Sequence, residues 1–224
     1  MSKRAERKAR EALFASVVED APAAGGHDEA IDEVTLASSG LSFGEAEGKR
    51  PLTMMKKFRF QLLAGWMAEN LAPCRAADIG GGKGLLAYLL SQHGWDATVI
   101  DPVYQTLPEK FKDLNTGRQI KLGERESVPR LSVPFTEDLA PRFDMLVAMH
   151  AHGCNIALID AAERYGKGFL ILPCCIIDEP LRPEPGVHWL PCLAGYARAK
   201  GFTLRPLRLN FKGQNIGLYA PPQK

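Results

Sequence analysis

The chain of 224 residues has little of what marks membrane, secreted or fibrous proteins. Its longest apolar run, residues 169–177, is far shorter than the ~20 residues that cross a bilayer. The first residues lack the apolar stretch of a signal peptide. Aromatic residues make up only 8% and charged residues 24%, a balance that excludes collagen, coiled coil and wholesale disorder. We therefore expect a cytoplasmic globular protein without a membrane-spanning segment.

Cysteine is also scarce, and its pattern excludes a disulfide framework. The five cysteines are an odd number without regular spacing, so we expect reduced thiols. Cys174 and Cys175 are adjacent, and four alternatives remain open for them: lining a site, holding a substrate thiol, packing as small apolar side chains, or binding a metal with His150, His152 or Cys154. The CxxC spacing usual for zinc is missing, so we predict no metal site.

The net charge is only +2, but it is the sum of two basic segments and one acidic segment between them. Residues 1–10 carry +4, residues 11–18 carry −1, residues 19–47 carry −8, and residues 48–224 carry +7. We predict a basic helical tail over residues 1–19, an acidic linker or poorly ordered flap over 20–49, and one folded domain over 50–224. The tail is either a solvated helix or a basic arm that contacts RNA. The basic body favours an anionic substrate or partner.

From residue 54 onward, apolar segments with helical spacing alternate with short apolar strands. Helices are predicted at 54–71, 84–93, 107–114, 156–165 and 189–200, and strands at 75–79, 97–100, 131–135, 143–149 and 169–173. A terminal hairpin is predicted from 202–209 and 216–219. This alternation predicts an α/β fold, with a mostly parallel, doubly wound sheet that ends in an antiparallel hairpin.

A glycine-rich loop follows the first predicted strand. After Asp78 and Ile79 come Gly80, Gly81 and Gly82, which allow a tight turn and a close approach of the backbone to a ligand. The next helix start offers free amides. Nineteen residues after Gly82, Asp101 ends the next strand, where a carboxylate can accept both ribose hydroxyls of an adenosine.

Two adenosine cofactors compete for this loop. A dinucleotide register through Gly82, Gly84 and Ala87 puts the first glycine three residues beyond the strand. The register Asp78-x-Gly80-x-Gly82 instead puts an acid at the strand end, where it would repel a pyrophosphate and attract a cation. S-adenosylmethionine carries an ammonium and a sulfonium group. The loop therefore favours this cofactor over NAD.

These motifs resemble those of the class I S-adenosylmethionine-dependent methyltransferases, over about residues 54–220. The resemblance implies a Rossmann-like, seven-stranded sheet. It also implies that Asp78 and Gly80–Gly82 line the methionine end of the cofactor, and that Asp101, with Pro102 beside it, holds the ribose. An inactive cofactor-binding protein and an NAD-dependent oxidoreductase are the alternatives.

Two later motifs narrow the resemblance. His150-Ala151-His152-Gly153 and Pro173-Cys174-Cys175 are similar to the HxCG-like and PCC motifs of a methyltransferase group related to the tRNA ribose 2′-O-methyltransferases. His152 stands where that group usually has cysteine. The extra zinc-binding module of the tRNA enzymes is also missing before residue 54, so RNA and a small anionic metabolite both stay open as acceptors.

The remaining candidate residues are assigned by their place beside the strands. His150 and Cys175 each follow a strand at the edge where ligands bind, so we predict catalytic roles for them; a packing or capping role for His150 stays open. Glu137 follows the third strand and is a candidate for the adenine amine. Gln61, four residues after Lys57, is a candidate for the cofactor carboxylate.

Overall fold

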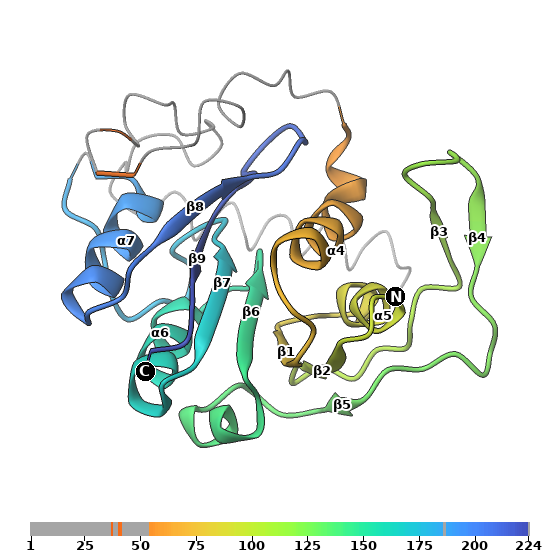
Figure 1. Ribbon diagram of the computed structural model, residues 1–224, viewed down its shortest axis with the longest axis horizontal. Helices are drawn as coiled ribbons and strands as arrows, with labels where there is room; N and C mark the ends of the chain where they lie inside the picture. Colours follow the sequence, from red (N-terminus) through yellow and green to blue (C-terminus); the bar gives the residue numbers. More distant parts are fainter. Residues whose placement is uncertain (1–36, 38–39, 42–53, 186, 224) are drawn as a thin grey trace, which may run out of the picture.

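The computed structural model describes residues 37, 40–41, 54–185 and 187–223 (Figure 1). The predicted basic tail and nearly all of the predicted acidic linker lie outside these residues. Leu41, within the linker segment, is buried in the core at 2% exposure, and the Arg198 guanidinium donates to the Gly40 carbonyl at 2.7 Å. In the part of the chain that the structure describes, no helix has both the length and the apolarity to cross a membrane.

A seven-stranded sheet forms the centre of the molecule, with strand order β5-β2-β1-β6-β7-β9-β8. Five strands are parallel; β9 is antiparallel to both β7 and β8. The strands are β1 (Arg75–Ile79), β2 (Asp96–Ile100), β5 (Arg130–Leu131), β6 (Met145–Met149), β7 (Gly168–Leu172), β8 (Arg205–Arg208) and β9 (Ile216–Ala220). This topology confirms the predicted fold class, a doubly wound sheet with a C-terminal antiparallel hairpin.

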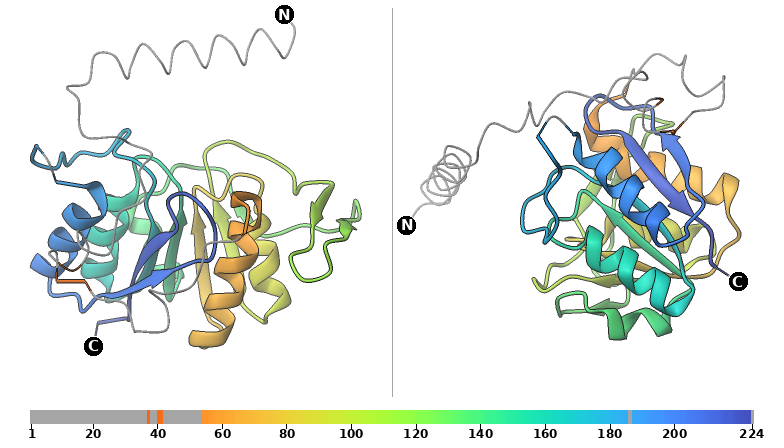
Figure 2. Two further views of the ribbon diagram at one scale, coloured as in Figure 1. Left: turned by 90° about the horizontal axis from the view of Figure 1, so that it is seen from above. Right: turned by 90° about the vertical axis from the view of Figure 1, so that its left-hand side faces the viewer.

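Helices cover both faces of the sheet (Figures 1 and 2). Two of them, α4 and α5, pack on one face; α6, α7 and the short helix η2 pack on the other. Their bounds are η1 (Lys56–Phe58), α4 (Arg59–Asn70), α5 (Leu85–Gln92), η2 (Glu137–Arg142), α6 (Asn155–Tyr165) and α7 (Trp189–Ala199). The predicted helix over residues 54–71 is therefore a 3-10 turn, η1, that leads into α4.

Strands β6 and β7 carry no polar side chain because both faces of the sheet are covered there. In β6 the side chains alternate: Leu146 and Ala148 enter the core beside α6, while Val147 and Met149 enter the core beside α4 and α5. All five residues of β6 and of β7 are buried. This continuous burial explains why these strands were predicted from the sequence as unbroken apolar runs.

The helix predicted over residues 107–114 is wrong. This segment holds β3 (Lys110–Lys112), which pairs antiparallel with β4 (Gln119–Lys121) in a separate hairpin. The Asp113 carboxylate accepts hydrogen bonds from the Thr116 backbone N–H at 2.7 Å and from its hydroxyl at 2.6 Å, and Gly117 follows with φ +69°. The Asp113 side chain takes the backbone hydrogen bond that Thr116 would have made within a helix, and the resulting turn reverses the direction of the chain. The edge strand predicted over 131–135 is confirmed only as β5.

Candidate functional site

The candidate site lies where the order of the strands reverses direction. β1 pairs with β2 on one side and with β6 on the other, so the connections after β1 and β6 diverge to opposite faces of the sheet. Open α/β sheets bind their ligands at the carboxyl edge beside such a point. The two loops touch there: a Cβ placed on Gly80 would lie 2.6 Å from the Ala151 Cβ. Gly80 also has φ +65°. Only glycine fits this position without strain.

Asp78, the acid of the loop motif, is buried beneath the glycines. Its side chain is 2% exposed, and its Oδ2 accepts a hydrogen bond from the Ala87 backbone N–H in the first turn of α5 at 3.3 Å. A Cβ on Gly81 would collide with the carboxylate, so only glycine fits at position 81 while Asp78 keeps this orientation. Burial raises the pKa of Asp78 from 3.8 to about 7. The chain thus keeps a carboxylate under the loop at a substantial electrostatic cost.

Asp101 stands across the loop at the end of β2, as predicted. Its Oδ2 accepts from the Gly82 N–H and its Oδ1 from the Val103 N–H, both at 2.9 Å, and Pro102 lies in the turn between. Each oxygen keeps a second acceptor site. The structure therefore brings Asp78, the three glycines and Asp101 together, and it holds the Asp101 carboxylate in one orientation before any ligand binds.

Arg130 is a component of this site that the sequence did not reveal. It lies on β5, where its Nη2 donates to the Gly82 carbonyl at 2.6 Å, and its guanidinium lies 5.8 Å from the Tyr104 ring centroid. Its buried Nη1 has no hydrogen-bond partner among the described residues. A buried donor of this kind calls for a ligand or water beside the glycine loop. A single base on a two-residue strand carried no pattern that could have identified it.

His150 lies at the end of β6 in a left-handed conformation, φ +54°. Its backbone N–H donates to the Leu172 carbonyl at 2.9 Å, and its Nε2 lies 2.9 Å from the Gln214 carbonyl. A carbonyl only accepts, so Nε2 carries the hydrogen and Nδ1 keeps its lone pair. Burial lowers the pKa of His150 from 6.5 to about 4. The imidazole is therefore neutral near pH 7.

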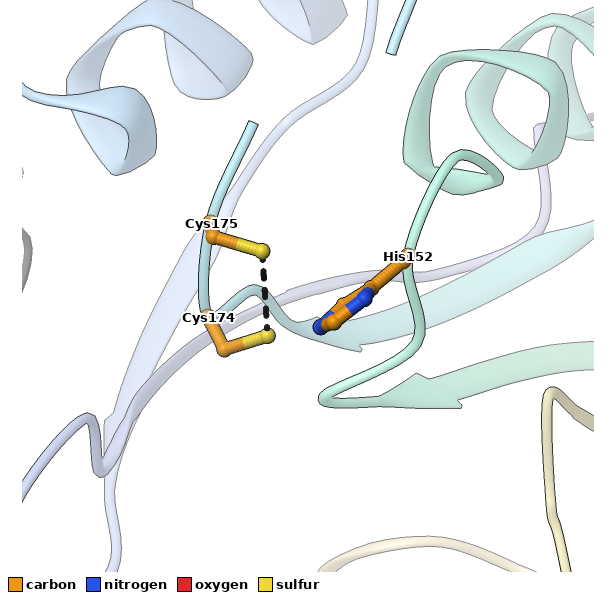
Figure 3. Close-up of side chains that lie close together, drawn as sticks. All are labelled: His152, Cys174 and Cys175. Atoms are coloured by element: carbon orange, nitrogen blue, oxygen red, sulfur yellow. Dashed lines mark hydrogen bonds between the residues drawn. The ribbon is translucent and has the colours of Figure 1, made fainter. Parts of the chain in front are cut away.

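Cys175, the second predicted catalytic residue, lies in a cluster with Cys174 and His152 (Figure 3). The Cys174 thiol donates to the Cys175 sulfur at a separation of 3.6 Å, and one ligand atom from each of the three residues lies within 4.8 Å of the others. The hydrogen bond to Cys175 and burial both raise the pKa of the Cys174 thiol above its ordinary value. The sequence left His150, His152 and Cys154 open as metal-binding partners of the two cysteines and predicted no metal site; the structure brings His152 to the cysteine pair.

Glu179 fastens the loop after β7 to the start of α6. It is 4% exposed; its Oε1 accepts from the Asn155 backbone N–H at 2.9 Å and side-chain amide at 2.6 Å, and its Oε2 accepts from the Ile156 N–H at 3.2 Å. These are the free N–H groups of a helix start. Gly153 is close to the same loop, since a Cβ there would lie 2.8 Å from the Asp178 Cβ. The Glu179 carboxylate thus caps α6 and fixes the loops after β6 and β7 relative to each other.

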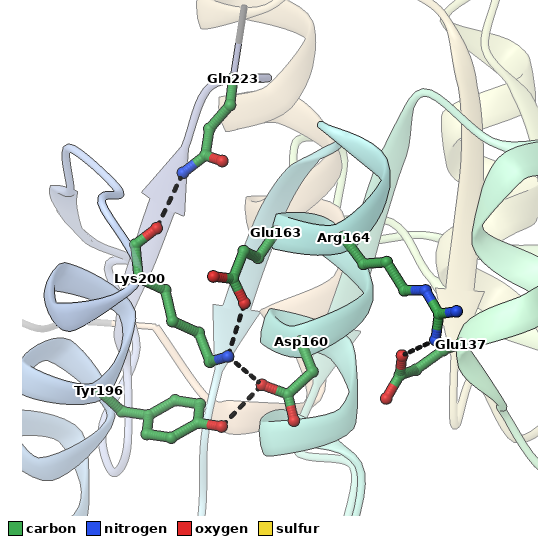
Figure 4. Close-up of polar contacts among 7 residues, drawn as sticks. All are labelled: Glu137, Asp160, Glu163, Arg164, Tyr196, Lys200 and Gln223. Carbon is green, nitrogen blue, oxygen red and sulfur yellow. Dashed lines mark hydrogen bonds and ion pairs between the residues drawn. The ribbon is translucent and has the colours of Figure 1, made fainter.

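The structure does not bring two of the predicted residues to the glycine loop. Gln61 on α4 donates through Nε2 to the Lys112 carbonyl at 2.8 Å and accepts through Oε1 from the Leu114 N–H at 2.7 Å, so it holds the β3–β4 hairpin. Glu137 in η2 pairs with Arg164 in the last turn of α6 at 3.4 Å (Figure 4).

The same view shows how α6 and α7 are joined. Lys200 lies 2.9 Å from Asp160 and 2.6 Å from Glu163, and the Tyr196 hydroxyl donates to Asp160 at 2.7 Å (Figure 4). These polar contacts lie between α6 and α7 and are partly buried, with Asp160 28% and Lys200 23% exposed. They connect helices and contribute nothing to the candidate site.

Comparison with protein-family models and with curated proteins finds no match. Among solved structures, the chain is similar to the 1,6-didemethyltoxoflavin-N1-methyltransferase of Burkholderia thailandensis with bound S-adenosylhomocysteine, at 17% identity and a TM-score of 0.47, over 75% of this chain and 80% of that one. It is also similar to the ribosomal protein L11 methylase of Lactobacillus delbrueckii subsp. bulgaricus, at 16% identity and a TM-score of 0.43, over 83% of each chain. Likeness at this level does not establish a shared activity, which has to come from the residues of the site.

Proposed function

We propose that the chain is an S-adenosylmethionine-dependent methyltransferase whose cofactor binds at the carboxyl edge of β1 and β2. The observation that carries this proposal is the buried carboxylate of Asp78 under a loop of glycines, with Asp101 fixed across the loop at the end of the neighbouring strand. A carboxylate and a glycine loop at a switch point suit a ligand that is cationic at one end and has a ribose at the other.

The charge of the loop separates this cofactor from a dinucleotide. A pyrophosphate would place its negative charge over Asp78, whereas an ammonium or sulfonium group would lower the cost of keeping that carboxylate ionised. Asp101, oriented by two backbone N–H groups, would accept from the ribose hydroxyls. Pro102, Val103 and Tyr104 follow it; the last two are 60% and 70% exposed and supply apolar surface next to this position.

Bound S-adenosylmethionine supplies a methyl carbon that its sulfonium already activates, so the chain has mainly to position the acceptor. Nδ1 of neutral His150, at the end of β6, is available to take a proton from the acceptor. Cys175 follows β7 at the same edge. We further propose that the acceptor is anionic, RNA or a small metabolite, because residues 48–224 carry a charge of +7.

Ligand-dependent thermal stability tests the cofactor. S-adenosylhomocysteine should raise the melting temperature of the full chain and NADH should not. Asp101→Ala should abolish the shift, whereas Asp96→Ala, at the exposed opposite end of the same strand, should preserve it. Stabilisation by NADH alone, or no stabilisation and no heat of binding with either ligand, would overturn the proposal.

Methyl transfer is tested separately from binding. The chain is incubated with methyl-labelled S-adenosylmethionine and separate pools of tRNA, rRNA, protein and small metabolites. Label in an RNA pool or in anionic metabolites would support the proposed acceptor class, and label only in protein would refute it. Cofactor binding without label in any pool would point to the alternative, an inactive binding protein.

A further inference from the structure

We propose that His152, Cys174 and Cys175 form a zinc site with three protein ligands and an open fourth position. The cluster is drawn in Figure 3: two sulfurs from the segment after β7 face an imidazole from the loop after β6. Nothing in the loop motif or in the proposed cofactor contacts requires these three side chains to meet. The inference is independent of the proposed function, since it concerns a metal and not the methyl donor.

The spacing of the donor atoms matches a tetrahedral ion. With zinc–sulfur bonds of about 2.3 Å, tetrahedral geometry sets two sulfur ligands about 3.8 Å apart. The Cys174 and Cys175 sulfurs are 3.6 Å apart. They are far from the ~2.05 Å of a disulfide. The imidazole nitrogen lies within 4.8 Å of both sulfurs, so a shift of about 1 Å in the His152 side chain completes the set.

The donor types select the metal. Two thiols and an imidazole suit zinc and other thiophilic ions, whereas magnesium and calcium require oxygen ligands, and the cluster contains no carboxylate. The half-buried cysteines and the exposed histidine leave the cluster open to an ion from solvent. The adjacent cysteines lack CxxC spacing, but their sulfurs lie 3.6 Å apart on the same side as the His152 imidazole (Figure 3).

The backbone around the cluster is fixed before any metal binds. The His150 N–H bond to the Leu172 carbonyl joins the ends of β6 and β7, and Glu179 caps α6 from beyond the two cysteines. The close approach of Gly153 to Asp178 brings the two loops together between these points. Ligands held in this way lose little conformational freedom when an ion binds, which favours a site.

Three protein ligands leave one position of a tetrahedral ion for water or for a donor atom of a substrate, as in catalytic zinc centres. His152 follows Ala151, which packs against Gly80 of the glycine loop, so the loop that carries the histidine also contacts the proposed cofactor loop. If the proposed function holds, a methyl acceptor with a thiol or other soft donor atom could bind there. Metal binding itself does not depend on that role.

Cobalt substitution tests the site on the full chain, purified without a metal-affinity tag and stripped with a chelator. Titration with Co²⁺ should give a thiolate-to-cobalt charge-transfer band that saturates at one ion per chain and disappears when Zn²⁺ is added. Cys174→Ser and Cys175→Ser should lose the band, and His152→Cys should retain it. The matched control is Cys192→Ser, which removes a thiol of α7 outside the cluster and should behave as the native chain.

A second measurement needs no substitution and so avoids any loss of folding. Zn²⁺ should slow alkylation of Cys174 and Cys175 by iodoacetamide at least tenfold, mapped by mass spectrometry, while the rate at Cys192 stays unchanged. Absence of the charge-transfer band in the native chain, a band that survives the double replacement of both cysteines, or equal alkylation with and without Zn²⁺ would overturn the proposal. Binding of S-adenosylhomocysteine is scored in parallel, so failure of the metal site is distinguishable from failure of the cofactor site.

Discussion

Replacing Asp78 with asparagine should make the chain more stable and a weaker binder of S-adenosylmethionine. Burial raises the pKa of Asp78 from 3.8 to about 7, so the folded state holds its proton while the unfolded state releases it. The stability associated with this proton is complete below pH 3.8 and is lost as pH rises through 7. Each pH unit between the two pKa values corresponds to about 1.4 kcal/mol, so the ionised carboxylate costs on the order of 4 kcal/mol at pH 8.

Urea denaturation of the native chain and of Asp78→Asn between pH 5 and 8.5 measures this cost. The stability advantage of the variant should grow with pH up to about 7 and then level off. S-adenosylmethionine, which favours the ionised carboxylate, should bind the native chain about tenfold more weakly at pH 6 than at pH 8 and should bind the variant poorly at both. Asp144→Asn is the contrasting control, because Arg75 holds the pKa of Asp144 below its ordinary value and the variant should be destabilised at neutral pH. An advantage for Asp78→Asn that does not change with pH, or none at pH 8, would refute the reasoning.

Gly80→Ala should abolish binding of S-adenosylhomocysteine in calorimetry because its Cβ would lie 2.6 Å from the Ala151 Cβ. Adding Ala151→Gly to the same chain removes this contact and should restore part of the binding. No restoration would show that the backbone angle of Gly80, φ +65°, is the decisive constraint. Leu41→Ala should cost about 2–5 kcal/mol in urea denaturation, and a chain that starts at residue 48 should lose a similar amount relative to one that starts at residue 37. Acidification from pH 6.5 to 4 should destabilise the native chain more than His150→Asn, because the pKa of the buried imidazole is lowered to about 4 and unfolding lets it take up a proton. Equal acid sensitivity of the two chains would contradict that account.

The sequence predicted the sheet well because its central strands are buried on both faces. A strand points successive side chains to opposite faces, so the apolar run at residues 145–149 fills the cores on both sides of the sheet. The glycines that follow residue 79 mark the turn at the carboxyl edge. The hairpin of β3 and β4 was missed for a local reason. Leu107 to Leu114 has enough apolar residues for a helix, but Asp113, Thr116 and Gly117 close a turn by side-chain hydrogen bonds, which apolar spacing does not record.

The site was predictable only where its residues lie on segments that are consecutive in the sequence. Asp78, the glycines and Asp101 are ordered along two consecutive strands, so their spacing predicted their meeting. Arg130 reaches Gly82 across 48 residues, and His152 meets the cysteine pair because β6 and β7 are neighbours. Such contacts depend on strand order and register. Gln61 and Glu137 were assigned by position along the chain, and their polar groups form other contacts in the fold.

The cap that Glu179 places on α6 limits how the chain can change in length. The carboxylate reaches Asn155 from a loop that starts at the end of β7, so the number of residues between Leu172 and Glu179 sets whether the cap forms. An insertion in that stretch would withdraw the carboxylate and leave buried N–H groups unsatisfied, unless the loop after Met149 lengthened with it. In related chains the lengths of these two loops should therefore vary together. A chain in which only one of the two loops has changed in length should carry a different residue at position 179.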